Sequence, residues 1–119
     1  EEVQIILSEV IEHNSIEEAM QLILKAMYQP FTKIIITTPN AAFNQFYFDS
    51  EGFRNDDHQF EFEPGQLVAL INSCLFRYAK TAQSASRPAT ATFQQIGDNL
   101  NGHQPILVAI IHQLNEPSC

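Results

Sequence analysis

Four short stretches of aliphatic and β-branched residues predict β-strands, at residues 3–7, 33–38, 89–96 and 106–112. The first two are almost continuously apolar, which is typical of buried parallel strands. The last two are separated by a polar segment that contains Asn101-Gly102, a strong turn signal. The pattern therefore predicts two parallel strands followed by a terminal antiparallel pair.

Two further stretches have the period of a helix. Residues 16–27 carry apolar side chains three and four positions apart, and Ser15 with Glu18 forms the sequence signature of a capping box. A second helix is expected to begin at Pro64, a residue suited to the first helical position, and to run to about Tyr78. The residues expected to face inward from this helix are Leu67, Leu70, Ile71, Cys74 and Leu75.

The segments between these elements complete the predicted plan. Residues 40–63 form a long polar and aromatic loop, and residues 81–88, rich in Ala and Ser, form a connector. The order of the elements is strand, helix, strand, helix, strand, strand. This order predicts an α/β fold.

Length and composition limit the class of protein. A chain of 119 residues with 45% hydrophobic content supports one domain at most. No apolar run approaches the roughly 18 residues of a membrane span, and no signal peptide is evident. Cys74 and Cys119 are too few for a disulfide framework, so we expect a core thiol and a tail thiol in a reducing, cytoplasmic compartment.

The first candidate site follows the first predicted strand. If the chain turns helically there, Glu9, Glu12 and His13 share one face, because they stand at i, i+3 and i+4. Two carboxylates and an imidazole suit a divalent cation, and His58 could complete the set, with Asp57 orienting its ring. The alternative is an acidic turn with one solvated histidine, and the spacing leaves both interpretations open.

Three blocks of sequence in the correct order carry a resemblance to one family. The run Glu9-Val10-Ile11-Glu12-His13 resembles the metal-binding motif of the small-RNA 3′-terminal 2′-O-methyltransferases. The run Thr37-Thr38-Pro39-Asn40, followed by Phe43-Asn44, resembles the segment after the family's fifth strand. Residues 53–62 (FRNDDHQFEF) resemble its second metal segment, with Phe62 where a Trp is usual. The run Glu63-Pro64-Gly65 also replaces the polar helix start that is usual in the family. Both departures concern packing and the start of the next helix more than the proposed metal ligands.

The resemblance implies a fold and shows which part of it is present. Methyltransferases of this kind have a Rossmann-like class I sheet in which a glycine-rich turn after the first strand cradles S-adenosylmethionine. None of the four glycines of this chain lies in a G-x-G arrangement between a strand and a helix. Residues 1–119 are therefore expected to be the C-terminal part of a catalytic domain. The first strands and the cofactor turn would be absent, so the fragment alone should be inactive.

The same resemblance implies the chemistry. Glu9, Glu12, His13 and His58 are expected to bind one Mn²⁺ or Mg²⁺ ion, which would chelate the 2′- and 3′-hydroxyls of a terminal nucleotide. The methyl donor would be S-adenosylmethionine, and the substrate the 3′ end of a small or cleaved RNA. Roles in RNA repair and in RNA silencing are both compatible with the family. A metal-dependent hydrolase and a non-catalytic interaction module remain as alternatives from other classes.

The charge of the chain weighs against a large RNA-binding surface. Its net charge is −8, and its six basic residues form no run, whereas phosphate contacts need Lys and Arg. A partner domain or protein is therefore expected to supply most of the contact with the RNA backbone. The aromatic residues Phe43, Phe46 and Tyr47 either stack on a terminal base or pack the loop onto the sheet. His103 and His112, outside the three blocks, are not expected to be ligands.

Overall fold

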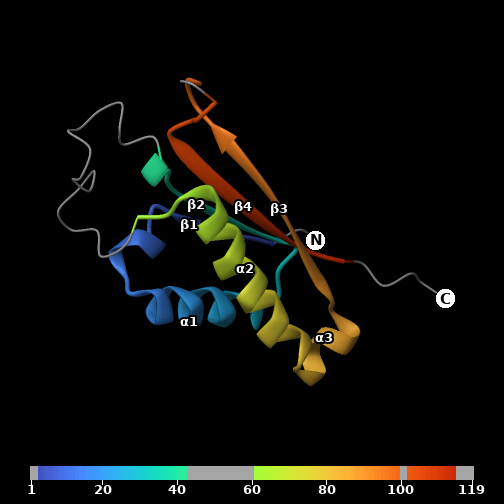
Figure 1. Cartoon of the computed structure of the whole chain (residues 1–119). Coiled ribbons are helices and arrows are strands. Elements are labelled where there is room, and N and C mark those ends of the chain that lie inside the picture. The colour runs from blue at the N-terminus through green and yellow to red at the C-terminus, as the bar shows by residue number, and fades with distance from the viewer. Residues whose placement is uncertain (1–2, 43–60, 100–101, 115–119) are drawn as a thin grey trace.

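The computed structural model describes residues 3–42, 61–99 and 102–114 (Figure 1). The predicted element order is confirmed, and the bounds differ from those predicted by a few residues. In chain order the elements are β1 (Gln4–Ser8), the 3-10 turn η1 (Ile11–His13), α1 (Ile16–Met27), β2 (Lys33–Pro39), α2 (Pro64–Ala79), α3 (Ala82–Ser86), β3 (Ala89–Ile96) and β4 (Ile106–Gln113).

The four strands form one sheet in the order β1-β2-β4-β3. Strand β1 runs parallel to β2, whereas β4 is antiparallel to both β2 and β3, so the terminal antiparallel pair is confirmed. The expectation that the first strand is buried is wrong for the described residues. Strand β1 pairs only with β2 there, its residues alternate between exposed and half-buried, and Ile6 is 62% exposed.

Both long helices cover the same face of the sheet, and the core lies between them and the strands (Figure 1). The strands contribute alternate residues to this core, because successive side chains of a strand point to opposite faces. The fully buried apolar strand residues are Ile34, Ile36, Ala109 and Ile111. On the opposite face, the register places Ile6, Ile35 and Ile110 in one row across β1, β2 and β4.

The local sequence explains where the helices begin. The capping box of α1 is present: Ser15 Oγ accepts from the Glu18 backbone N–H at 3.1 Å, and the Ser15 N–H donates to Glu18 Oε1 at 2.9 Å. Helix α2 begins at Pro64, and its N-cap Glu63 takes part in a second capping box with Gln66.

The segment predicted to be a connector joins α2 to β3 and contains the short helix α3, which was not predicted. Ser84 donates through Oγ to the carbonyl of Thr81 at 2.9 Å, and the Arg87 N–H donates to the Gln83 carbonyl at 3.0 Å. Tyr78, buried at the end of α2, donates through its hydroxyl to the Arg87 carbonyl at 2.6 Å. These bonds hold α3 as one tight turn between α2 and β3.

No helix in the described ranges is both long and apolar enough to span a membrane.

Candidate functional site

Buried polar side chains gather at the carboxyl end of β2. Among the described residues, the buried polar or charged ones are Glu12, Thr38, Asn40 and Glu61. Thr38 and Asn40 lie in β2 and directly after it, Glu12 comes from η1, and Glu61 precedes Phe62, which forms a β-bridge with Asn40. Burying a polar group costs free energy unless it is hydrogen-bonded. Such a concentration therefore indicates a functional end of the sheet.

Glu9 directly follows β1 and has a left-handed conformation. Its φ is +55°, a positive value found for no other non-glycine residue in the described part of the chain. The Glu9 N–H donates to the Thr37 carbonyl at 2.9 Å, and Thr37 Oγ1 lies 3.4 Å from Glu9 Oε2. The helical turn starts only at Ile11, so the predicted i, i+3, i+4 face that included Glu9 is wrong. The strained φ lets the chain leave the strand and enter η1 within two residues.

Glu12 and His13 lie side by side in η1 but in different environments. The Glu12 side chain is fully buried, and its Oε1 accepts from Thr38 Oγ1 at 2.7 Å. The His13 side chain is 41% exposed, and its Nε2 lies 3.9 Å from Glu12 Oε2. A fixed carboxylate beside an accessible imidazole offers one oxygen and one nitrogen donor at the same place.

The structure brings together only part of the predicted ligand set. Neighbouring residues of β2 anchor two of its members, since Thr37 contacts Glu9 and Thr38 contacts Glu12. Within residues 3–42, 61–99 and 102–114, no three His, Cys, Asp or Glu side chains are already grouped to hold a metal ion. His58 lies outside the described residues, as do Arg54, Asp57 and the aromatic residues of 43–48. The four-residue ligand set therefore stays a prediction.

The described residues on either side of segment 43–60 meet at the end of β2. Asn40 and Phe62 form a parallel β-bridge, and the Ala41 N–H donates to the Phe62 carbonyl at 2.8 Å. Phe62, which stands where the family resemblance leads one to expect Trp, is buried in the core. The described residues on both sides of that segment are therefore joined at Asn40, two residues from Thr38, which holds Glu12.

Asn40 connects this end of β2 to the turn between β3 and β4. Its Nδ2 donates to the Gln104 carbonyl at 2.8 Å and to Gln95 Oε1 at 3.3 Å, and its Oδ1 accepts from the Ala42 N–H at 3.0 Å. The sequence analysis included Asn40 only as part of a family motif. An Asn directly after a Thr-Thr-Pro strand end is the one signal that could have indicated this role.

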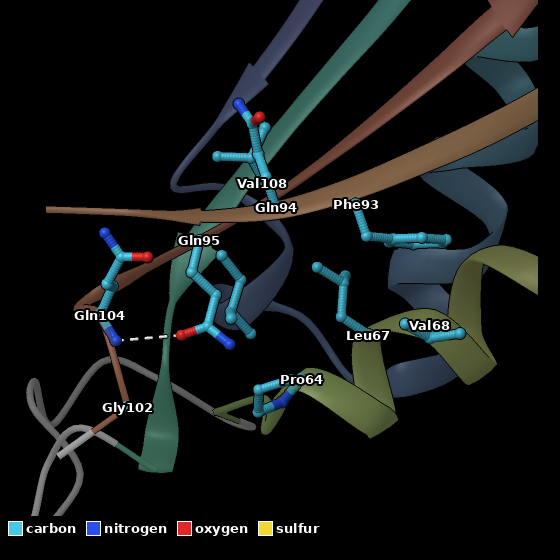
Figure 2. A pocket seen from close by; sticks show the side chains of 10 residues that line it. Pro64, Leu67, Val68, Phe93, Gln94, Gln95, Gly102, Gln104 and Val108 are labelled. Atoms are coloured by element: carbon cyan, nitrogen blue, oxygen red, sulfur yellow. Dashed lines mark hydrogen bonds between the residues drawn. The ribbon is translucent and has the colours of Figure 1, made fainter. Parts of the chain in front are cut away.

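A pocket that the sequence analysis missed lies beside Asn40, between the start of α2 and the β3–β4 pair (Figure 2). Its volume is about 360 Å³, and its lining residues carry no charge. The sequence signal was Gln94-Gln95, a polar pair inside a predicted strand. Its lining includes Pro64, Leu67, Val68, Phe93, Gln95 and Gln104.

The remaining candidate groups have structural surroundings. Burial raises the pKa of the Cys74 thiol to about 11, against a smaller opposing effect of Arg77, so the thiol stays protonated and is a poor nucleophile. His112 lies on β4 with Nε2 3.1 Å from Thr92 Oγ1 on the neighbouring strand. His103 lies in the turn before β4.

Comparison with known proteins gives matches among solved structures. A scan against protein-family models and a search of curated proteins both return no match. A chain from the structure of the Pnkp1/Rnl/Hen1 RNA repair complex is 36% identical over 92% of this chain, with a TM-score of 0.72, and this chain spans 22% of its length. The small RNA methyltransferase HEN1 matches all of this chain at 23% identity and a TM-score of 0.76, over 14% of its own length. The methyltransferase domain of a bacterial Hen1, CtHen1, matches 92% of this chain at 21% identity and a TM-score of 0.63, over 52% of its length.

These matches bear on both the fold and the family. The last two lie below 25% identity and show that the α/β sheet has the arrangement found in Hen1 methyltransferase structures. The first covers nearly the whole of this chain at a higher identity but leaves most of the larger protein unmatched, so this chain spans about a fifth of that relative. The family resemblance read from the three sequence blocks is thereby confirmed, and the chain belongs to the Hen1-like family.

Proposed function

We propose that this chain is part of an RNA methyltransferase that transfers a methyl group from S-adenosylmethionine to the 2′-hydroxyl of the 3′-terminal nucleotide. The observation that carries the proposal is the group of buried polar side chains at the end of β2, with the fully buried Glu12 held by Thr38 at 2.7 Å. An acidic group fixed in this way on a Hen1-like sheet fits a cation-dependent reaction at the end of an RNA.

The proposed cation ligands are Glu9, Glu12, His13 and His58. Carboxylate and imidazole donors together suit Mn²⁺, and Mg²⁺ binds through the carboxylates and water. A cation in such a site lowers the pKa of a bound hydroxyl and orients it. The chain's own residues prepare the donors: Thr38 fixes the Glu12 carboxylate in a buried position, and Thr37 lies against Glu9.

We also propose that residues 1–119 are the C-terminal part of a longer catalytic domain. Strand β1 has one partner among the described residues, and no described helix covers the face that carries Ile6, Ile35 and Ile110. An edge strand and an apolar sheet face of this kind need further covering elements.

A domain built in this way would hold the cofactor largely outside this chain. The isolated 119-residue chain is therefore expected not to bind S-adenosylmethionine tightly. A micromolar dissociation constant in isothermal titration, near −8 kcal/mol, would contradict this arrangement.

The charge of the chain bears on its partners. The match to a chain of the Pnkp1/Rnl/Hen1 RNA repair complex supports an assembly in which other domains or proteins contribute to RNA handling. A net charge of −8 makes this chain a weak binder of phosphates by itself. We therefore propose that basic surfaces outside this chain hold the RNA backbone, while this chain reads the terminus.

The experiment that tests the proposed function compares three RNA ends with the full-length protein and S-adenosylmethionine. One RNA ends in a free 2′,3′-diol, the second carries a 3′-phosphate, and the third has a 2′-deoxy terminus. Methylation of the first alone is expected, because only that end offers both hydroxyls to a cation. Equal methylation of the RNA with the 3′-phosphate would show that a chelated terminus is not what the enzyme recognises.

A further inference from the structure

The neutral pocket between α2 and the β3–β4 pair has the shape and chemistry of a small aromatic-ligand site. Its volume of about 360 Å³ falls within the range of ligand pockets. Pro64 and Leu67 at the start of α2 form an apolar wall, and Phe93 and Val68 lie together at another side (Figure 2). Phe93 is 37% exposed, so its ring is accessible to a planar ligand.

The polar groups of the pocket are amides that are held in place. Gln95 Oε1 accepts from the Gln104 N–H at 3.0 Å and from Asn40 Nδ2 at 3.3 Å, which fixes the orientation of the Gln95 amide (Figure 2). Within the described part of the chain, Gln95 Nε2 donates to no protein acceptor. Gln104 Nε2 donates to the Gly97 carbonyl at 2.7 Å. The Gln104 amide oxygen remains as an acceptor.

An aromatic face, an oriented amide donor and an amide acceptor, without any charge, match a nucleobase. A base presents a flat π-face and a mixed edge of donors and acceptors, and proteins hold unpaired bases by stacking and by hydrogen bonds to that edge. Charged side chains, which commonly bind phosphates and metal ions, are not among these lining residues.

The pocket is joined to the buried acidic site through Asn40. On one side of this residue, Thr38 in the same strand holds Glu12; on the other, the Asn40 amide holds Gln95 and Gln104. The strand order β2-β4-β3 places β3 two strand spacings, about 10 Å, from β2. A base in the pocket would therefore lie close to a nucleotide whose ribose is at Glu12.

We infer that this pocket binds a nucleobase at the 3′ end of the RNA and positions the terminal ribose at the acidic site, an inference that rests on the proposed function. The same chemistry would also suit the adenine of S-adenosylmethionine. The test therefore measures both ligands separately.

Two substitutions address the pocket in the full-length protein. Val68→Trp fills the space with a bulky ring. Gln95→Glu keeps the oxygen that accepts from Gln104 and Asn40 but removes the amide donor. The matched control is Asn72→Trp, which adds the same ring at an exposed position of α2 outside this pocket. Circular dichroism and thermal unfolding confirm that each variant is folded.

Fluorescence anisotropy measures binding of an RNA with its last two bases intact and of the same RNA with abasic sites there. For the unsubstituted protein, removal of the bases should weaken binding about tenfold, as loss of a stacked base does. Val68→Trp and Gln95→Glu should weaken binding of the intact RNA by a similar factor. Neither should change the affinity for the abasic RNA or for S-adenosylmethionine, and Asn72→Trp should leave all three affinities unchanged.

Equal binding of intact and abasic RNA would overturn the inference. So would variants that lose affinity for S-adenosylmethionine and keep their affinity for RNA, since the base would then belong to the cofactor. Normal methylation of RNA together with unaffected RNA binding by both variants would reject the pocket and leave the proposed function standing. Absence of methylation by the unsubstituted protein would reject the proposed function, whereas base-dependent RNA binding would still support the pocket.

Discussion

The two faces of the sheet are built from alternate residues of the same strands, yet they have different surroundings. Ile34 and Ile36 of β2 point to the face covered by α1 and α2 and are fully buried. Ile35, between them, points to the other face and is only half-buried, next to the exposed Ile6 of β1. Three consecutive isoleucines are typical of a strand buried on both sides. The described residues supply a cover for one side only.

The polarity of the buried residues on the covered face changes along β2 and just after it. Ile34 and Ile36 are apolar, whereas Thr38 and Asn40 are polar, although all four are buried. The apolar part lies in the core under the helices, and the polar part holds Glu12, Gln95 and Gln104. We therefore expect substitutions in the first part to change stability and substitutions in the second part to change binding.

The largest expected effect is a loss of stability, and a pair of substitutions at neighbouring residues of β2 compares it on the two faces of the sheet. In this chain, Ile36→Ala should lower the free energy of unfolding by about 2–5 kcal/mol, because it opens a cavity in a packed core. Ile35→Ala removes the same atoms from a half-buried position and should cost clearly less. Urea denaturation followed by circular dichroism measures both.

The same pair sharpens the comparison when it is repeated in the full-length protein. If further elements cover the open face, the cost of Ile35→Ala should rise towards that of Ile36→Ala. Equal costs in the 119-residue chain would contradict the difference between the faces. An unchanged small cost of Ile35→Ala in the full-length protein would argue against the covering layer.

The second expected effect, of intermediate size, is a loss of Mn²⁺ affinity when the polar end of the covered face is changed. Glu12→Gln keeps the shape of the side chain and the oxygen that accepts from Thr38, but it removes the negative charge. We expect Mn²⁺ affinity of the full-length protein to fall at least about 100-fold, which corresponds to about 2.7 kcal/mol. Stability should change much less than in Ile36→Ala. Isothermal titration with Mn²⁺ and urea denaturation give the two values.

The matched control for this substitution is Glu17→Gln on the exposed side of α1. Glu17 lies 3.9 Å from Arg77 and its side chain is 68% exposed, so its charge is solvated. His58→Ala provides an independent test of the ligand set and should also abolish tight Mn²⁺ binding. Retention of wild-type affinity by either Glu12→Gln or His58→Ala would remove that residue from the site.

Hydrophobic periodicity and local caps were sufficient to predict most of the fold. The bounds of α1 follow from Ser15, Glu18 and the apolar spacing, because these signals are local. Helix α3 was missed because its Ala and Ser residues have no apolar period, and the turn is held by hydrogen bonds such as that from Ser84. The exposure of β1 was missed because burial depends on neighbouring strands, which a strand's own sequence does not specify.

The candidate site could be predicted in part. The acidic pair and His13 were recognised from their motif, but the left-handed φ of Glu9 is a tertiary effect that depends on its bond to Thr37. Asn40 and the pocket at Gln95 were missed because their contacts join residues 55 and 64 positions apart. Periodicity reports which face a residue occupies, whereas such contacts depend on the packing of distant segments.

The smallest expected effect lies at the surface, away from both faces of the sheet, and gives a reference for the other two. Ser15→Ala removes the N-cap of α1 and should lower the free energy of unfolding by about 1 kcal/mol at neutral pH.

The backbone and side-chain hydrogen bonds of Ser15 hold the pKa of Glu18 below its ordinary value of 4.5. A lowered carboxyl pKa stabilises the folded state above the ordinary value, and this contribution is lost as the pH falls through the folded pKa. Glu18→Gln keeps an acceptor for the Ser15 N–H but cannot titrate, so its stability should fall less than that of the unsubstituted chain between pH 5 and pH 3. Urea denaturation across this range measures the difference. Parallel pH dependence of the two chains would show that the Ser15–Glu18 cap contributes nothing to the acid sensitivity of the fold.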